Sequence, residues 1–159
     1  MPVILGISPG NRHSGIAIMK DGKLIDWRIL SFPGIWSTKK LRAICMDVYR
    51  VIKDYEVDAV VVKIPDELPR TKAFIQLVGA LNILFERRKL KAIYATLSEL
   101  KDLYKLHPRC RQELFVTHVV ARHPELLPEY QREQMNVNKY YEKLFEAVAA
   151  AHYFSRVCE

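Results

Sequence analysis

A lysine within an apolar run is the first residue of this sequence that calls for a chemical explanation. Lys63 lies in "VDAVVVKIP", Val57 to Pro65, directly after three valines. A buried ammonium without a counter-charge is costly, so we expect Lys63 to lie close to a carboxylate. Near the C-terminus, Glu142 and Glu146 are four residues apart, which places both on one face of a helix. Carboxylates gathered in this way are also the ligands that Mg²⁺ prefers.

A serine raises a second question in "ILGISPGNRHSGIAIM", Ile4 to Met19. Ser8 ends the first apolar run of the chain, immediately before a turn marked by glycine. We interpret Gly10 and Gly15 as residues of the turn and of a close approach between backbones. His13 in the same turn is either a general base or a solvated turn residue.

These residues must be positioned by one domain, because the chain has 159 residues, of which 50% are hydrophobic. Three short apolar segments at the N-terminus predict strands over 3–8, 14–19 and 24–30. Asp21-Gly22 accepts positive φ angles and predicts a hairpin between the second and the third strand. The first three strands are therefore expected to form an antiparallel meander.

Helices and strands alternate in the rest of the chain. Ser37 or Thr38 can cap a helix that ends near Tyr55, and buried parallel strands are predicted over 57–65 and 90–95. Further helices are predicted over 71–88, 98–104, 111–122 and about 137–154, with a break at "HPELLPEY", where Pro124 and Pro128 lie. Right-handed crossovers then give an α/β domain spanning 1–159, with a mixed five-stranded sheet flanked by helices.

This order of elements, together with the opening motif, resembles the ribonuclease H-like superfamily and, within it, the RuvC-type Holliday-junction resolvases. The family opens with approximately "LGIDPGxxxxG", and this chain has "LGISPGNRHSG", Leu5 to Gly15. "VDAVVVKIP" resembles the family's fourth strand, and "FIQLVGALNILFERRKLKAIYA", Phe74 to Ala95, resembles its next helix and strand. "FEAVAAAHYF", Phe145 to Phe154, resembles the closing helix. The resemblance therefore covers nearly the whole chain.

The resemblance implies a metal-dependent nuclease whose carboxylates hold two divalent ions. Carried over position by position, the family's metal ligands fall at Ser8, Lys63, Lys143 and Glu146, and only Glu146 is acidic. We therefore expect no catalytic residue and no metal or other cofactor, and we hypothesise that Lys63 pairs with Glu146 and occupies the space of the metal. The alternative is a relocated site for Mg²⁺ or Mn²⁺ built from Glu146, Glu142 and Asp66.

Positive charge is concentrated in one part of the sequence. The formal net charge is +7, and Glu86 to Arg111 contains eight basic and three acidic residues, an excess of +5. Such a segment either contacts a polyanion such as DNA or forms a solvated basic surface. The residues predicted to contact nucleic acid are Arg87, Arg88, Lys89, Lys105, Arg109 and Arg111.

Three functions remain open from the sequence. The first is a catalytically degenerate RuvC-like protein that binds DNA or branched nucleic acid without cleaving it. The second is an active metal-dependent endonuclease with the relocated site, and the third is a structural or protein-interaction subunit. The resemblance implies a homodimer. No apolar run suits a membrane span, and no signal peptide is evident. The scattered Cys45, Cys110 and Cys158 fit free thiols, so we expect a cytoplasmic protein.

Overall fold

The structure is a computed structural model that describes residues 2–67, 71–136 and 139–158. Its centre is a five-stranded sheet in the order β3-β2-β1-β4-β5. The strands are β1 (Val3–Ser8), β2 (His13–Lys20), β3 (Lys23–Ser31), β4 (Ala59–Ile64) and β5 (Lys91–Thr96). The first three pair antiparallel, whereas β4 lies parallel to β1 and β5 parallel to β4. The predicted mixed sheet is therefore confirmed.

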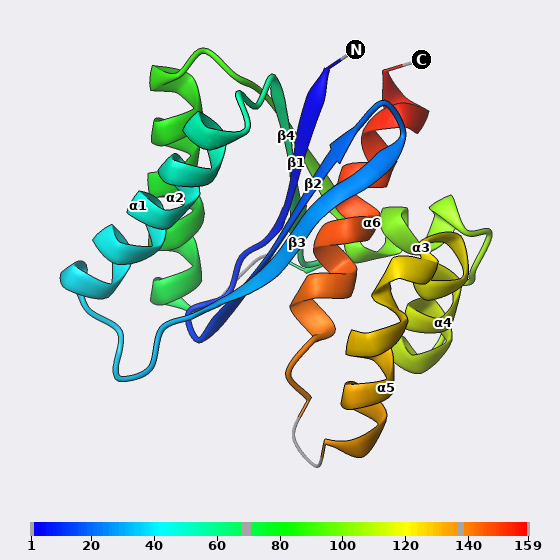
Figure 1. Cartoon of the computed structure of the whole chain (residues 1–159). Coiled ribbons are helices and arrows are strands. Elements are labelled where there is room, and N and C mark those ends of the chain that lie inside the picture. Colours follow the sequence, from blue (N-terminus) through cyan, green and yellow to red (C-terminus); the bar gives the residue numbers. More distant parts are fainter. Residues whose placement is uncertain (1, 68–70, 137–138, 159) are drawn as a thin grey trace.

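Helices cover both faces of this sheet (Figure 1). One face carries α1 (Thr38–Asp54) and α2 (Lys72–Arg87), and the other carries α6 (Glu142–Val157) together with α3 (Leu97–Leu103), α4 (Gln112–Arg122) and α5 (Leu127–Met135). Each face has its own apolar core, because β1 and β4 are buried on both sides. Among the described residues, no helix has both the length and the apolar character that crossing a bilayer requires.

Local signals in the sequence explain most element boundaries. The Ser37 side chain accepts the backbone N–H of Lys40 at the start of α1, and the Thr71 side chain accepts that of Phe74 at the start of α2. Asp21 and Gly22 both have positive φ, as the predicted hairpin requires. The predicted capping residue of α1 and the predicted hairpin turn are therefore confirmed.

The region around Pro124 and Pro128 corrects the sequence prediction. A break was expected there, but Pro124 begins a 3₁₀ turn and Pro128 lies in the first turn of α5. Proline is tolerated at these positions because the first backbone N–H groups of a helix have no partner within the helix. The last helix also begins at Glu142 rather than near Val137, and Val137 lies outside the described residues.

Candidate functional site

Ser8 is the last residue of β1 and Lys63 the last but one of β4, so both lie near the ends of neighbouring strands on the same side of the sheet. Ile7 of β1 pairs with Val62 of β4, so the residue after each lies at the shared carboxyl edge. Side chains alternate between the faces of a strand, and Ile4 and Val61 belong to the core that faces α6. The same alternation directs Ser8 and Lys63 towards α6.

Helix α6 lies close to the strands because glycines leave room for it. A Cβ on Gly6 would overlap the carbonyl of Ala147, and a Cβ on Gly15 would overlap the carbonyl of Lys143. The prediction that Gly15 marks a close approach is therefore confirmed. This approach brings the first turns of α6, with Lys143 and Glu146, to the ends of β1 and β4.

Glu146 is the centre of the resulting cluster. It is only 3% exposed, and its Oε1 accepts a hydrogen bond of 2.8 Å from the hydroxyl of the fully buried Ser8. The Lys63 ammonium lies 3.3 Å from the same oxygen, and the Lys143 ammonium lies 3.8 Å from it. The other oxygen, Oε2, accepts the side-chain amide of Gln112 at 3.2 Å. The expected proximity of Lys63 to Glu146 is thus present in the structure.

The charges of the cluster affect one another. Burial, and then the proximity of Glu146, raise the pKa of Glu142 above its ordinary value, although Lys143 and Lys63 act in the opposite direction. Burial lowers the pKa of Lys143, and the charge of Lys63 lowers it further, whereas Glu146 opposes the shift. Two ammonium groups therefore share one buried carboxylate, while a second carboxylate nearby is partly discouraged from ionising.

These donors do not fit a divalent cation. A hard ion needs several oxygen ligands, chiefly carboxylates, but the positions around Glu146 hold two ammonium groups and a hydroxyl that already donates to it. Each oxygen of Glu146 already accepts a hydrogen bond from a side chain. In the described ranges, no three histidine, cysteine or acidic side chains gather closely enough to hold a metal ion.

The relocated set of Glu146, Glu142 and Asp66 is not brought together as one site. Asp66 accepts the backbone N–H of Ser98 at 3.1 Å, beyond the end of β5. Burial acts to raise its pKa, but the hydrogen bonds from Ser98 and Thr96 outweigh burial, and the pKa lies below its ordinary value. Asp66 thus serves the start of α3, and only Glu142 accompanies Glu146 on α6.

Beside the cluster is a shallow pocket of about 170 Å³ between the β1–β2 turn and the start of α6. Arg12, Lys139 and Lys143 contribute cationic side chains to its lining, together with His13 and a single carboxylate, Glu142. His13 is engaged there, because its Nδ1 lies 3.0 Å from the Ser31 hydroxyl and its ring packs edge-on against that of Tyr140. The pocket therefore offers an electropositive surface next to Glu146.

Sequence reasoning missed three residues of this region. Gln112 reaches Glu146 from α4, and Arg12 and Lys139 line the shallow pocket from the turn and from the segment before α6. Nothing local marks Gln112, which is 34 residues from its partner. Lys139 was overlooked because the predicted basic segment ended at Arg111.

The fold distributes the six predicted DNA-contacting residues, although all are exposed. Arg87, Arg88 and Lys89 precede β5, at the edge of the sheet opposite to Ser8 and Lys63. The Arg88 guanidinium lies 5.3 Å from the centre of the Tyr49 ring. By contrast, Arg111 immediately precedes Gln112, whose amide reaches Glu146. Lys105 and Arg109 lie in the connection between α3 and α4. The six residues therefore do not form one surface around Glu146.

Comparison with known proteins gives one consistent result. No family model and no curated protein matches the sequence. Among solved structures, Thermus thermophilus RuvC in complex with Holliday junction substrate is similar with a TM-score of 0.75 and 15% identity, over 98% of this chain and 93% of that one. A second Thermus thermophilus RuvC structure is similar with a TM-score of 0.72 and 17% identity, over 98% of this chain and 96% of that one. The chain therefore has a RuvC-like, ribonuclease H-type α/β fold.

Proposed function

We propose that this chain binds branched or duplex DNA at the carboxyl edge of its sheet and does not cleave it. The observation that carries the proposal is the arrangement of Lys63 and Lys143 around Glu146, at 3.3 and 3.8 Å from the same carboxylate oxygen. In a two-metal nuclease, the cations that offset such a carboxylate are the metal ions. Here, two ammonium groups of the chain supply that positive charge.

Binding is supported by charge and by fold. The chain has a net charge of +7, and Arg12, Lys139 and Lys143 line the shallow pocket beside Glu146. A protein of the same fold was solved with a Holliday junction substrate. Cationic side chains around such an edge contact phosphates and make binding sensitive to salt. Arg111, next to Gln112, extends this basic edge, whereas Arg87 to Lys89 would contact DNA only if it reached the far edge.

The experiment measures binding and cleavage together. A labelled four-way junction and a duplex are titrated with protein from 25 to 300 mM salt, with and without Mn²⁺. Binding is followed by fluorescence anisotropy, and strand integrity is checked on a denaturing gel. We expect affinity that falls steeply with salt and strands that stay intact.

Two variants locate the interface. Arg12→Ala and Lys139→Ala are each expected to weaken binding and to reduce the salt slope by about one. Lys23→Ala is the matched control, because this exposed lysine follows the hairpin at the opposite end of β2. Mn²⁺-dependent cleavage that Glu146→Gln abolishes would establish the relocated nuclease instead. If the protein neither binds nor cleaves either substrate at low salt, the remaining function is that of a structural subunit.

A homodimer is part of the proposal, and an exposed apolar stripe on α2 supports it. Ile75 and Ile83 are 54% and 50% exposed, and they lie four residues on either side of Gly79, on one face of the helix. A Cβ on Gly79 would have no neighbour within 4 Å. Sedimentation velocity is expected to show a dimer that Ile75→Asp dissociates, and a monomeric wild-type chain would refute this part.

A further inference from the structure

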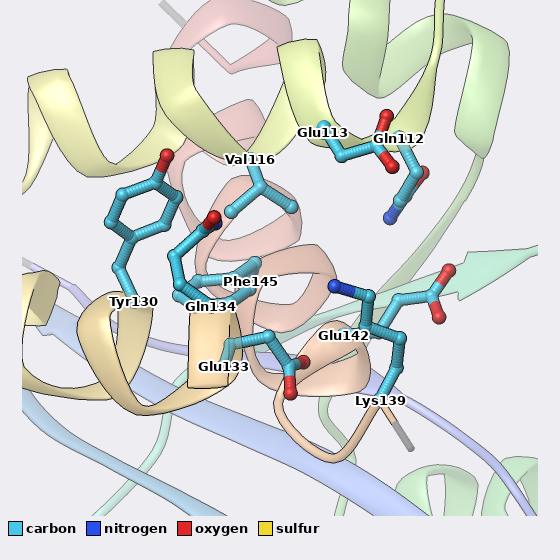
Figure 2. A pocket seen from close by; sticks show the side chains of 9 residues that line it. All are labelled: Gln112, Glu113, Val116, Tyr130, Glu133, Gln134, Lys139, Glu142 and Phe145. Carbon is cyan, nitrogen blue, oxygen red and sulfur yellow. The ribbon is translucent and has the colours of Figure 1, made fainter. Parts of the chain in front are cut away.

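A second pocket, of about 210 Å³, opens beside the cluster between α4, α5 and the start of α6 (Figure 2). Its apolar lining comes from Val116, Tyr130 and Phe145, one residue from each of the three helices. This volume is below the roughly 300 Å³ at which pockets for drug-sized ligands begin, and above the about 150 Å³ of a cavity that accepts benzene. The pocket therefore suits a group with one or two rings.

The polar lining of this pocket consists mostly of hydrogen-bond acceptors. Glu113 and Glu142 line it, and within the described part of the chain neither makes a hydrogen bond or an ion pair. Glu133 is already engaged, because it accepts the backbone N–H groups of Tyr140 and Tyr141 at 2.8 and 2.7 Å. Two carboxylates are thus available for a ligand that donates hydrogen bonds, and they would repel a phosphate.

The side of the pocket that adjoins the shallow pocket carries charges of both signs. Lys139 and Glu142 line both this pocket and the shallow pocket that contains Arg12, so one ammonium and one carboxylate lie where the two meet. Around the shallow pocket the cations of Arg12, Lys139 and Lys143 outnumber the single carboxylate of Glu142, so a phosphate is attracted to that side. The arrangement matches a nucleotide whose planar base enters between α4 and α5 while its phosphate stays outside on Lys139 and Arg12.

We propose that the pocket between α4, α5 and α6 receives one unstacked nucleobase of the bound nucleic acid and favours a base with an exocyclic amine. This inference rests on the proposed function and specifies its ligand. Carboxylates accept hydrogen bonds from the N4 amine of cytosine, and the amine of adenine offers the same donor, whereas thymine has no exocyclic amine. The half-buried Tyr130 supplies the aromatic surface against which a base packs, and the fully buried Phe145 forms the apolar floor beneath it.

The test uses four-way junctions that carry a single unpaired nucleotide, moved in turn to each position flanking the branch point. At each position the nucleotide is cytosine, adenine, thymine or abasic, and affinity is measured by anisotropy at fixed salt. At one or more positions, cytosine or adenine is expected to bind about 5- to 100-fold more tightly than the abasic form. The affinity for the thymine form is expected to lie between that for the cytosine or adenine form and that for the abasic form.

The variant Gln134→Trp places a bulky ring in the lining of the pocket from an exposed position on α5. This variant should reduce the affinity for every junction to that of the abasic junction. The salt dependence of binding, which comes from the phosphate contacts, should be unchanged. Gln131→Trp is the matched control, because Gln131 is exposed on the same helix but does not line the pocket. It should keep the preference for cytosine or adenine.

The outcomes separate this inference from the proposed function. Equal affinity for all four forms at every position, with binding retained, would overturn the nucleobase pocket and leave DNA binding intact. A base preference that survives Gln134→Trp would also overturn it, because the base would then lie elsewhere. No binding of any junction at low salt would overturn the proposed function and, with it, the inference.

Discussion

Replacing Lys63 with methionine should destabilise the protein more than the loss of one lysine near the end of a strand usually does. The Lys63 side chain is 12% exposed, and that of its partner Glu146 is 4% exposed. Removing one member of a buried ion pair typically costs 3–5 kcal/mol, because the other charge remains buried without its partner. Lys143 stays 3.8 Å from the same oxygen and lessens the loss. We therefore expect Lys63→Met to lower the free energy of unfolding by about 2–3 kcal/mol.

The double variant makes the reasoning specific to the pair. Glu146→Leu alone leaves Lys63 and Lys143 without their shared carboxylate, whereas Lys63→Met with Glu146→Leu removes the charges on both sides of the shortest contact. The cost of the double variant should therefore be smaller than the sum of the single costs, by about 1–3 kcal/mol.

The assay is urea unfolding at pH 7, followed by circular dichroism and analysed by linear extrapolation. Arg50→Ala is the matched control. It breaks the pair between Arg50 and Asp47, whose side chains are 67% and 34% exposed, and should cost less than about 1 kcal/mol. A coupling between Lys63 and Glu146 below about 0.5 kcal/mol would refute the idea that the ammonium compensates the buried carboxylate.

Three further predictions concern stability. Glu142→Gln should stabilise the protein at pH 7. Burial and Glu146 raise the pKa of Glu142, so its ionisation opposes folding above pH about 4.5. Urea unfolding curves of the variant and the wild-type protein should therefore differ at pH 7 and converge at pH 4. Burial lowers the pKa of His152 from 6.5 to about 4, so the unfolded chain binds a proton at a higher pH than the folded chain does. As the pH falls from 6.5 to 4, the free energy of unfolding should therefore decrease by at most about 3 kcal/mol. His152→Gln should reduce this loss in acid titrations. Gly15→Ala should cost more than about 2 kcal/mol by urea unfolding, because the methyl group overlaps the Lys143 carbonyl. Gly79→Ala should be neutral or stabilising for the monomer, because its methyl group meets no atom of its own chain within 4 Å.

The fold was largely predictable because its signals are local. The alternation of β1 to β3, the Asp21-Gly22 hairpin and the caps at Ser37 and Thr71 act within a few residues of one another. The helix α5 was missed because proline was interpreted as a break, although in the first turn of a helix it breaks no hydrogen bond.

The candidate site was predictable only in part. That Lys63 needs a carboxylate follows from its apolar neighbours, and the choice of Glu146 came from the family resemblance. Gln112 and the meeting of Arg12 with Lys139 depend on how α4 and the segment before α6 pack against the sheet, and no periodicity in the sequence encodes this. The basic residues between Arg87 and Arg111 are close in sequence but do not form one surface. The strand β5 and the helix α3 lie between the first and the last of them and separate them in space.

The most direct test of the central claim, that ammonium groups of the chain take the place of metal ions around Glu146, is a titration of Mn²⁺ followed by electron paramagnetic resonance. The wild-type protein is expected to leave millimolar Mn²⁺ free in solution. A variant that combines Ser8→Asp with Lys63→Glu provides three carboxylates at the ends of β1 and β4 and on α6, and it should bind the ion. Stoichiometric Mn²⁺ binding by the wild-type protein, lost in Glu146→Gln, would contradict the claim.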